Sequence, residues 1–210
     1  YGAKALAAGV GISVSLTSLN LRANNLRDEG WCAVFDALRD NPQNKIKEWN
    51  ISGQGINTTI AKSLAAYAAV STSLTSLDLS WNSINAEGAK ALAAGVAVST
   101  SLTSLDLSSN NLAGETSYVE ATEVQGDSFN KGDKVIYQGR EMIISKGKNG
   151  NGYLRMIDLS GVKAIADALG VSASLTSLNL RRNGLGPEGA AALAPAIAVS
   201  TSLIELDAVS

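Results

Sequence analysis

The sequence predicts an α/β fold of stacked repeat units, each with a short strand and a helix, and a small β-rich insertion. Three observations lead to this fold class. A leucine motif recurs at nearly constant spacing, apolar residues at helical spacing follow each copy, and one long segment of different composition interrupts the series. A single short unit cannot bury its apolar face alone, so the units must stack on one another.

The repeat begins with a leucine or isoleucine that recurs six times. The successive spacings are 30, 28, 28, 73 and 28 residues, so the fourth spacing exceeds the common one by 45. The segment GAKALAAGV occurs twice without change, at 2–10 and 88–96, which indicates that the units have diverged little. The six starting positions are Leu16, Ile46, Leu74, Leu102, Leu175 and Leu203.

Each unit opens with a predicted short strand. The third unit has Leu74, Leu77, Leu79, Asn82 and Ile84 in the pattern L-x-x-L-x-L-x-x-N-x-L. Alternation places the second and third leucines of this pattern on one face of a strand. The asparagine can donate and accept, so we expect a ladder of asparagines that satisfies buried backbone groups where the strands end.

The second unit departs from this pattern, with Ile46, Trp49 and Ile51 at the apolar positions and Gln54 in place of the asparagine. We expect Gln54 to break the ladder.

The second half of each unit is predicted to be a helix. Ala89, Leu92, Ala93 and Val96 form one apolar stripe at i, i+3, i+4 and i+7. We expect Pro195 to kink or shorten the last helix. The other predicted stripes are Trp31, Val34, Phe35, Leu38; Ala61, Leu64, Ala65, Ala68; Val162, Ile165, Ala166, Leu169; and Ala190, Leu193, Ala194, Ile197.

The repeated pattern resembles the leucine-rich repeat, and its 28-residue period resembles the ribonuclease-inhibitor-like subclass of that family. The resemblance covers about four-fifths of the chain. It implies a curved solenoid with the parallel sheet on the concave side and the helices on the convex side. Because the chain starts within a predicted helix and stops within a predicted strand, we expect it to be part of a longer array.

The insertion divides the chain into predicted repeats at 1–114, a β-rich segment at 115–156 and further repeats at 157–210. The segment at 132–141, GDKVIYQGRE, resembles the opening of a small SH3-like barrel. An alternative takes Leu154, Ile157 and Leu159 as a degenerate repeat strand. The predicted strands of the insertion are Tyr118–Val124, Lys134–Gln138, Arg140–Ser145 and Tyr153–Leu159, with a turn at Gly147–Gly152.

Composition excludes most enzyme classes. The chain has no histidine and one cysteine, Cys32, so it has no Ser-His-Asp triad, no His-ligated zinc and no internal disulfide. Its 17 basic and 19 acidic residues give a net charge of −2, which does not favour nucleic-acid binding. We expect no cofactor, no bound metal and no insertion into a membrane.

The candidate binding residues are the polar strand positions that face away from the leucines. Asp78 and Asp106 could be read as a carboxylate pair, but solvated repeat positions explain them better than acid–base catalysis. Trp81 is either a partner anchor or a packing residue, and the face as a whole lacks a cluster of Trp, Tyr and Arg. The candidates on this face and its rim are Arg22, Glu48, Asn50, Asp78, Trp81, Asp106, Asn179 and Arg181, and those of the insertion are Tyr137, Arg140 and Lys148.

These observations predict a non-enzymatic, intracellular scaffold that binds one or more proteins and belongs to a longer chain or larger assembly. Two alternatives stay open. One is an accessory subunit docked on a large algal assembly, which includes the case of a membrane-bound assembly. The other is a regulator of small GTPases, a role that some ribonuclease-inhibitor-like repeat proteins have.

Overall fold

The repeats form one parallel sheet. A computed structural model describes residues 2–208 of the chain. Five strands pair in the order β1-β2-β3-β8-β9, and every neighbouring pair is parallel. Equivalent repeat positions face one another, as in Trp49, Leu77 and Leu105. The strands are β1 (Glu48–Asn50), β2 (Ser76–Asp78), β3 (Ser104–Asp106), β8 (Ser177–Asn179) and β9 (Glu205–Asp207).

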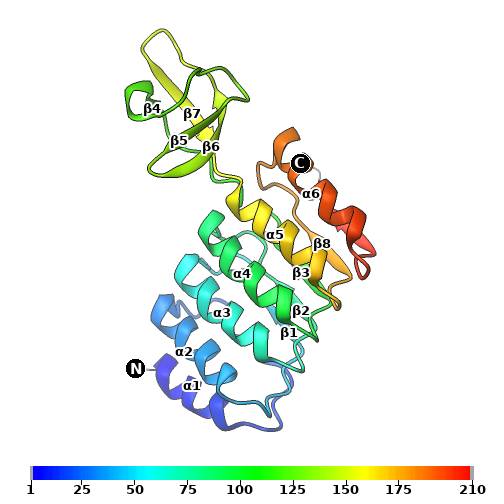
Figure 1. The fold of residues 1–210 in the computed structure, drawn as a ribbon. Coiled ribbons are helices and arrows are strands. Elements are labelled where there is room, and N and C mark those ends of the chain that lie inside the picture. Colours follow the sequence, from blue (N-terminus) through cyan, green and yellow to red (C-terminus); the bar gives the residue numbers. More distant parts are fainter. Residues whose placement is uncertain (1, 209–210) are drawn as a thin grey trace.

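Six helices pack side by side in chain order and lie on one face of this sheet (Figure 1). None of the described helices is long and apolar enough to cross a bilayer. The helices are α1 (Gly2–Ile12), α2 (Arg27–Arg39), α3 (Thr58–Val70), α4 (Ala86–Val98), α5 (Ser160–Val171) and α6 (Gly186–Val199).

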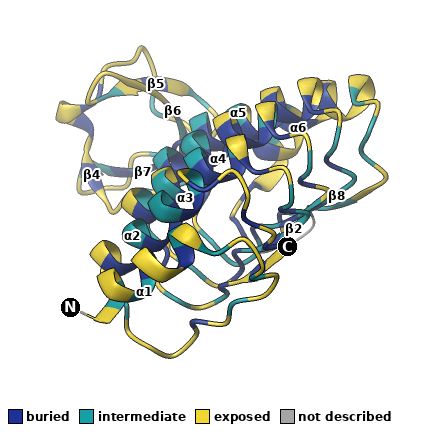
Figure 2. Cartoon of the chain, turned by 90° about the horizontal axis from the view of Figure 1, so that it is seen from below, coloured by how far each residue is buried: buried dark blue, intermediate teal, exposed yellow. Residues whose placement is uncertain are grey.

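The core lies between the helices and the strands, where Figure 2 shows the buried residues gathered. Leu77 and Leu79 are both buried, although only the first lies within β2. The predicted apolar stripes of α2, α3, α4 and α5 are buried as well. In α2 the stripe is aromatic, and Phe35 contacts both Trp49 of β1 and Tyr67 of α3.

The asparagine ladder is present. Asn110 donates from Nδ2 to the carbonyl oxygens of Leu107 and Leu79, and its Oδ1 accepts from the amide of Ile84. Asn82 and Asn183 make the equivalent bonds in their own units. Each of these three asparagines therefore joins two adjacent units.

The expectation that Gln54 breaks the ladder is wrong in part. Its Nε2 donates to the carbonyl of Ser52 at 3.1 Å, and its Oε1 accepts from the amide of Ala23 at 3.0 Å. The longer side chain still joins two units, because its extra methylene lets the amide reach a different backbone group.

The first unit contradicts the prediction, because its residues 16–21 form no strand. Leu16 and Leu19 are only half-buried. Side-chain hydrogen bonds connect this segment to the second unit. Arg22, for example, donates to the hydroxyl of Ser52 at 3.1 Å. No unit precedes this one in the described chain, so its leucines have a neighbour on one side only.

Two expectations for α6 are wrong in part. Pro195 does not shorten the helix, which continues for 14 residues from Gly186 to Val199, whereas the kink stays a prediction. Of the predicted stripe only Leu193 is buried, whereas Ala190, Ala194 and Ile197 are exposed. In α4 the equivalent positions are covered by α5, and no helix follows α6 among the described residues.

Residues between β3 and α5 form a second sheet, which is antiparallel and has the order β4-β7-β6-β5. It has its own buried cluster, including Val135, Ile144, Leu154 and Met156. The elements are β4 (Val119–Glu120), the 3-10 helix η1 (Ala121–Glu123), β5 (Lys134–Tyr137), β6 (Arg140–Lys146) and β7 (Tyr153–Ile157).

The predicted hairpin around Gly139 is confirmed by the pairing of β5 with β6. The strand expected at Tyr118–Val124 is wrong beyond Glu120, where η1 begins. Reading Leu154, Ile157 and Leu159 as a repeat strand is also wrong. β7 pairs with β6 and β4 in the second sheet, whereas β3 pairs directly with β8 in the first.

Candidate functional site

The sheet presents a row of polar side chains on the face opposite the helices. Register places Asn50, Asp78, Asp106, Asn179 and Asp207 side by side, one from each strand. They point away from the core because they alternate with the buried apolar residues of the strands. We call this set the polar row.

Two carboxylates of the polar row hold the ends of their own strands. Asp78 Oδ1 accepts from the amide and hydroxyl of Ser80, at 2.9 and 2.7 Å. Asp106 Oδ1 accepts from the amide of Ser108 at 2.8 Å, and its Oδ2 accepts from Asn179 at 3.0 Å. These bonds occupy the two groups as structural acceptors and support the interpretation of solvated repeat positions.

Just beyond the polar row, each unit has a residue with left-handed backbone geometry. The φ angles are +64° at Gly53, +56° at Trp81, +55° at Ser109 and +54° at Arg182. Such angles are uncommon outside glycine, and a tryptophan or arginine in this region is strained. Hydrogen bonds between neighbouring units hold this strained backbone in place, since the amide of Trp81 donates to the carbonyl of Ser108 at 3.0 Å.

This geometry brings Trp81 and Arg182 together over the small Ser109. The guanidinium carbon of Arg182 lies 5.7 Å from the centroid of the Trp81 ring, which is a cation–π contact. Trp81 nevertheless remains 64% exposed. Arg181 is beside them and pairs with Asp207 at 3.4 Å. These residues line an open, shallow hollow of about 240 Å³, which we call the Trp–Arg hollow and whose lining is Trp81, Ser108, Ser109, Asn179, Arg181 and Arg182.

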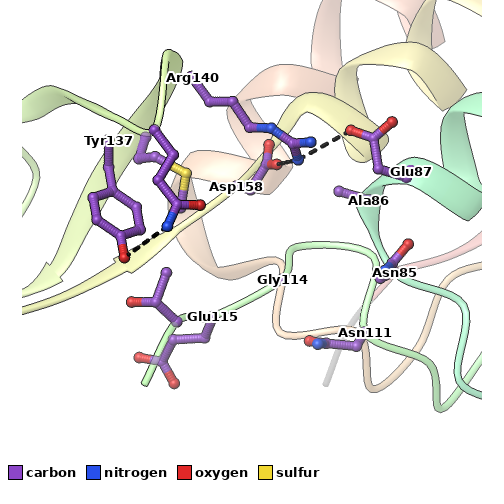
Figure 3. A pocket seen from close by; sticks show the side chains of 12 residues that line it. Asn85, Ala86, Glu87, Asn111, Gly114, Glu115, Tyr137, Arg140 and Asp158 are labelled. Carbon is purple, nitrogen blue, oxygen red and sulfur yellow. Dashed lines mark hydrogen bonds and ion pairs between the residues drawn. The ribbon is translucent and has the colours of Figure 1, made fainter. Parts of the chain in front are cut away.

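A second hollow of about 310 Å³ lies where the second sheet meets the repeats (Figure 3). Arg140 of β6 reaches into the gap and pairs with Glu87 of α4 at 3.0 Å and with Asp158 at 3.4 Å. The ammonium of Lys90 lowers the pKa of Glu87 by hydrogen bonding to it, and the charge of Arg140 lowers it further.

Comparison with known proteins identifies the repeat. The sequence profile of the leucine-rich repeat family matches residues 13–31, 70–93, 98–115 and 171–194. The chain carries leucine-rich repeats. A solved structure described as Leiomodin-1 Actin-Binding Site 2 (ABS2) resembles it with a TM-score of 0.55 and 14% identity, over 94% of this chain and 88% of that one. No curated protein sequence matches the chain.

The leucine-rich repeats bring most of the predicted face residues together. Asn50, Asp78, Asp106 and Asn179 lie in the polar row, and Glu48 lies at the start of β1 on the same side. Trp81 and Arg181 line the Trp–Arg hollow, together with Asn179. Arg22 is exposed in the strandless first unit, where it contacts Ser52.

The predicted residues of the second sheet are separate from this face. Tyr137 and Arg140 line the second hollow, and Arg140 serves there as a tie between the sheet and the leucine-rich repeats. Lys148 is exposed in the loop between β6 and β7 and is not among the residues that line either hollow.

The expectation that this face lacks a cluster of Trp, Tyr and Arg is wrong in part, because one tryptophan and two arginines come together, without a tyrosine. Arg182 was not among the predicted residues, yet it completes such a cluster with Trp81 and Arg181. The repeats themselves contain the pattern that could have predicted this cluster. Aligning the units places Trp81, Ser109 and Arg182 in one column, but the 73-residue spacing separates the last two in the sequence.

Within residues 2–208, no three side chains among Cys, Asp and Glu lie close enough together to hold a metal ion. What the face offers is charge, hydrogen-bonding groups and one large aromatic surface on a rigid sheet. Such a surface suits recognition of another molecule.

Proposed function

We propose that the protein is a non-enzymatic scaffold that binds a protein partner on the uncovered face of its parallel sheet. The observation that carries this proposal is the Trp–Arg hollow, which lies just beyond the polar row. Tryptophan and arginine are the residues most enriched among those that dominate binding energy at protein interfaces. Keeping a tryptophan 64% exposed in a strained conformation is costly for a monomer, and contact with a partner would bury it.

The proposal includes the finer architecture. The array is a curved solenoid of the ribonuclease-inhibitor-like subclass, with repeats at 1–114 and 157–210 and an inserted, SH3-like module at 115–156. Register from β1 to β9 supports a regular array. The short segment from β4 to Gln125 supports the barrel. Gln125 pairs with Ile136 of β5, so this segment joins opposite edges of the second sheet.

Partner capture from extract of the source cells tests the proposal. The full chain is immobilised, and the proteins it retains are compared with those retained by Trp81→Ala. Tyr118→Ala is the matched control. Tyr118 is 56% exposed and also lies under an arginine, Arg155, but in the second sheet. We expect a protein that the wild type and the control retain and that Trp81→Ala loses.

Two results would contradict the proposal. One is capture of a nucleic acid or small molecule with no protein. The other is a captured protein that both variants retain equally, because its binding site would then lie away from the sheet face.

A further inference from the structure

We propose that the Trp–Arg hollow is a receptor for a single carboxylate side chain, an aspartate or glutamate in an exposed segment of a partner protein. This inference rests on the proposed function and deepens it, since it states what kind of group the partner must present. Three observations carry it: the unused donors of Arg182, the size of the hollow and the sign of the charges around it.

Within the part of the chain that the structure describes, the guanidinium of Arg182 makes no hydrogen bond or ion pair, although five N–H groups are available. The second cation–π pair of the molecule behaves differently. Arg155, which lies over Tyr118, donates from Nε to the carbonyl of Thr116 at 3.1 Å and pairs with Glu115 at 2.7 Å.

The contrast between the two pairs indicates a function for Arg182. Arg155 stabilises the segment before β4, because its N–H groups bind Glu115 and Thr116 of that segment. The cation–π contact with Trp81 keeps the Arg182 guanidinium 5.7 Å from the ring centroid, and among residues 2–208 no acceptor takes up its N–H groups. A guanidinium is a planar fork of donors that matches both oxygens of a carboxylate. Arg181 adds a second positive charge to the same hollow, beyond its bond to Asp207 at 3.4 Å.

The size of the hollow favours one side chain. Its volume of about 240 Å³ is below the roughly 300–1,000 Å³ of sites that enclose whole small molecules. Ser108 and Ser109 line it together with the two arginines, and a serine hydroxyl can donate to an anion. An aspartate or glutamate side chain therefore fits the space and its donors.

The surrounding charge favours an isolated carboxylate over a polyanion. Three carboxylates of the polar row, those of Asp78, Asp106 and Asp207, lie on the strands that lead to the hollow. They would repel a phosphodiester backbone or a run of acidic residues. Without these carboxylates, a nucleotide would also suit the hollow, because its base could stack on the exposed tryptophan and its phosphate could pair with the arginines. We therefore favour a protein partner that presents one acidic residue.

Selection from a random peptide library displayed on phage tests the inference with the full chain as target. We expect peptides bound by the wild type to be enriched in aspartate or glutamate at one position. Arg182→Gln should lower this enrichment at least about tenfold, since loss of a hot-spot residue costs more than the roughly 1.4 kcal/mol that a tenfold change represents. Arg155→Gln, the matched control, should leave it unchanged. Arg182→Lys keeps the charge but loses the planar fork, so it should restore the enrichment only in part.

A fluorescence measurement places the bound peptide. Trp31 and Trp49 are each only 2% exposed, so quenching by acrylamide reports mainly on Trp81. The best selected peptide should protect Trp81 from acrylamide. The same peptide with its acid replaced by the amide should bind at least about tenfold more weakly. Folding of each variant is checked by its circular dichroism.

Several outcomes would overturn the inference. They are peptides without acidic enrichment, enrichment that survives Arg182→Gln, no selected peptide at all, or stronger protection of Trp81 by polyuridylic acid than by the peptide. The first two leave the scaffold proposal intact if capture from extract still depends on Trp81. Loss of that dependence contradicts the scaffold proposal itself, so the two failures are distinguishable.

Discussion

At the scale of single residues, the asparagine of each unit contributes most clearly to the fold. Asn183 is 2% exposed and bonds the carbonyls of Leu107 and Leu180 and the amide of Leu112. These groups belong to units on either side of the second sheet. One buried amide therefore joins parts of the chain that are more than 70 residues apart in sequence.

Asn183→Ala should lower the free energy of unfolding by about 2–3 kcal/mol, because it leaves buried backbone groups without partners. The control is Asn24→Ala. Asn24 is exposed and its Nδ2 bonds only carbonyls of its own unit, so a loss below about 1 kcal/mol is expected. Urea denaturation measures both values. Equal losses would show that the bonds between units contribute nothing extra.

Glu87 provides a second prediction at this scale. Its folded-state pKa is lowered by Lys90 and then by Arg140, so its ion pairs add stability above the ordinary pKa of 4.5. That contribution is lost as the pH falls through the lower folded-state pKa.

Glu87→Gln should therefore destabilise the protein at neutral pH, by less than about 1 kcal/mol because the carboxylate is half-exposed. The difference from wild type should vanish in acid. Denaturant midpoints of both proteins, taken at neutral pH and below the folded-state pKa of Glu87, measure this difference in stability. A difference that persists in acid would mean that the substitution acts through packing and not through charge.

At the scale of elements, close packing of neighbouring helices depends on glycine. A Cβ at Gly95 of α4 would lie 2.5 Å from the carbonyl oxygen of Ala65 in α3. Gly9 of α1 occupies the same position of the identical segment GAKALAAGV, but nothing lies within 4 Å of the Cβ it would carry. The same residue thus has two different environments.

Gly95→Ala should destabilise the protein by about 1–3 kcal/mol, because the added carbon overpacks the α3–α4 contact. Gly9→Ala should stabilise it by about 0.5–1 kcal/mol, since alanine favours a helix and meets no neighbour. Thermal or urea unfolding measures both. Two changes of the same sign would contradict the packing explanation.

At the scale of the whole molecule, two cores share one chain. The second sheet has its own apolar cluster, and the main core runs on from β3 to β8 without it. The chain leaves and re-enters the repeats at adjacent points, since the amide of Asp158 donates to the carbonyl of Ala113 at 3.1 Å. Half-exposed ion pairs such as Arg140–Glu87 tie the two parts together.

Deletion of 115–156, with Gly114 joined to Ile157, should leave the repeats folded. The ion pairs that are lost contribute little, so we expect the repeats to lose no more than about 2 kcal/mol. Circular dichroism should show the helices and one cooperative unfolding transition. A broad transition, or loss of the helical signal, would show that the second sheet is part of the repeat fold.

Prediction from sequence succeeded where a pattern was repeated. The apolar stripes of α2 to α5, the asparagine ladder and the hairpin around Gly139 follow from spacing and turn chemistry alone. It failed at the ends of the described array, where Leu16 and Ile197 lack a neighbour that the inner units have. It also missed Arg182, because a side chain two units from Trp81 is a neighbour only after the strands have paired.

The sequence by itself determined the repeat, its strand and helix halves and the polar character of the sheet face, because these depend on local periodicity. Tertiary structure alone decided which copies of one motif are buried and which are open, as the identical segments around Gly9 and Gly95 show. It also decided that Trp81 and Arg182 meet. Both outcomes depend on contacts between units, which a one-dimensional pattern does not contain.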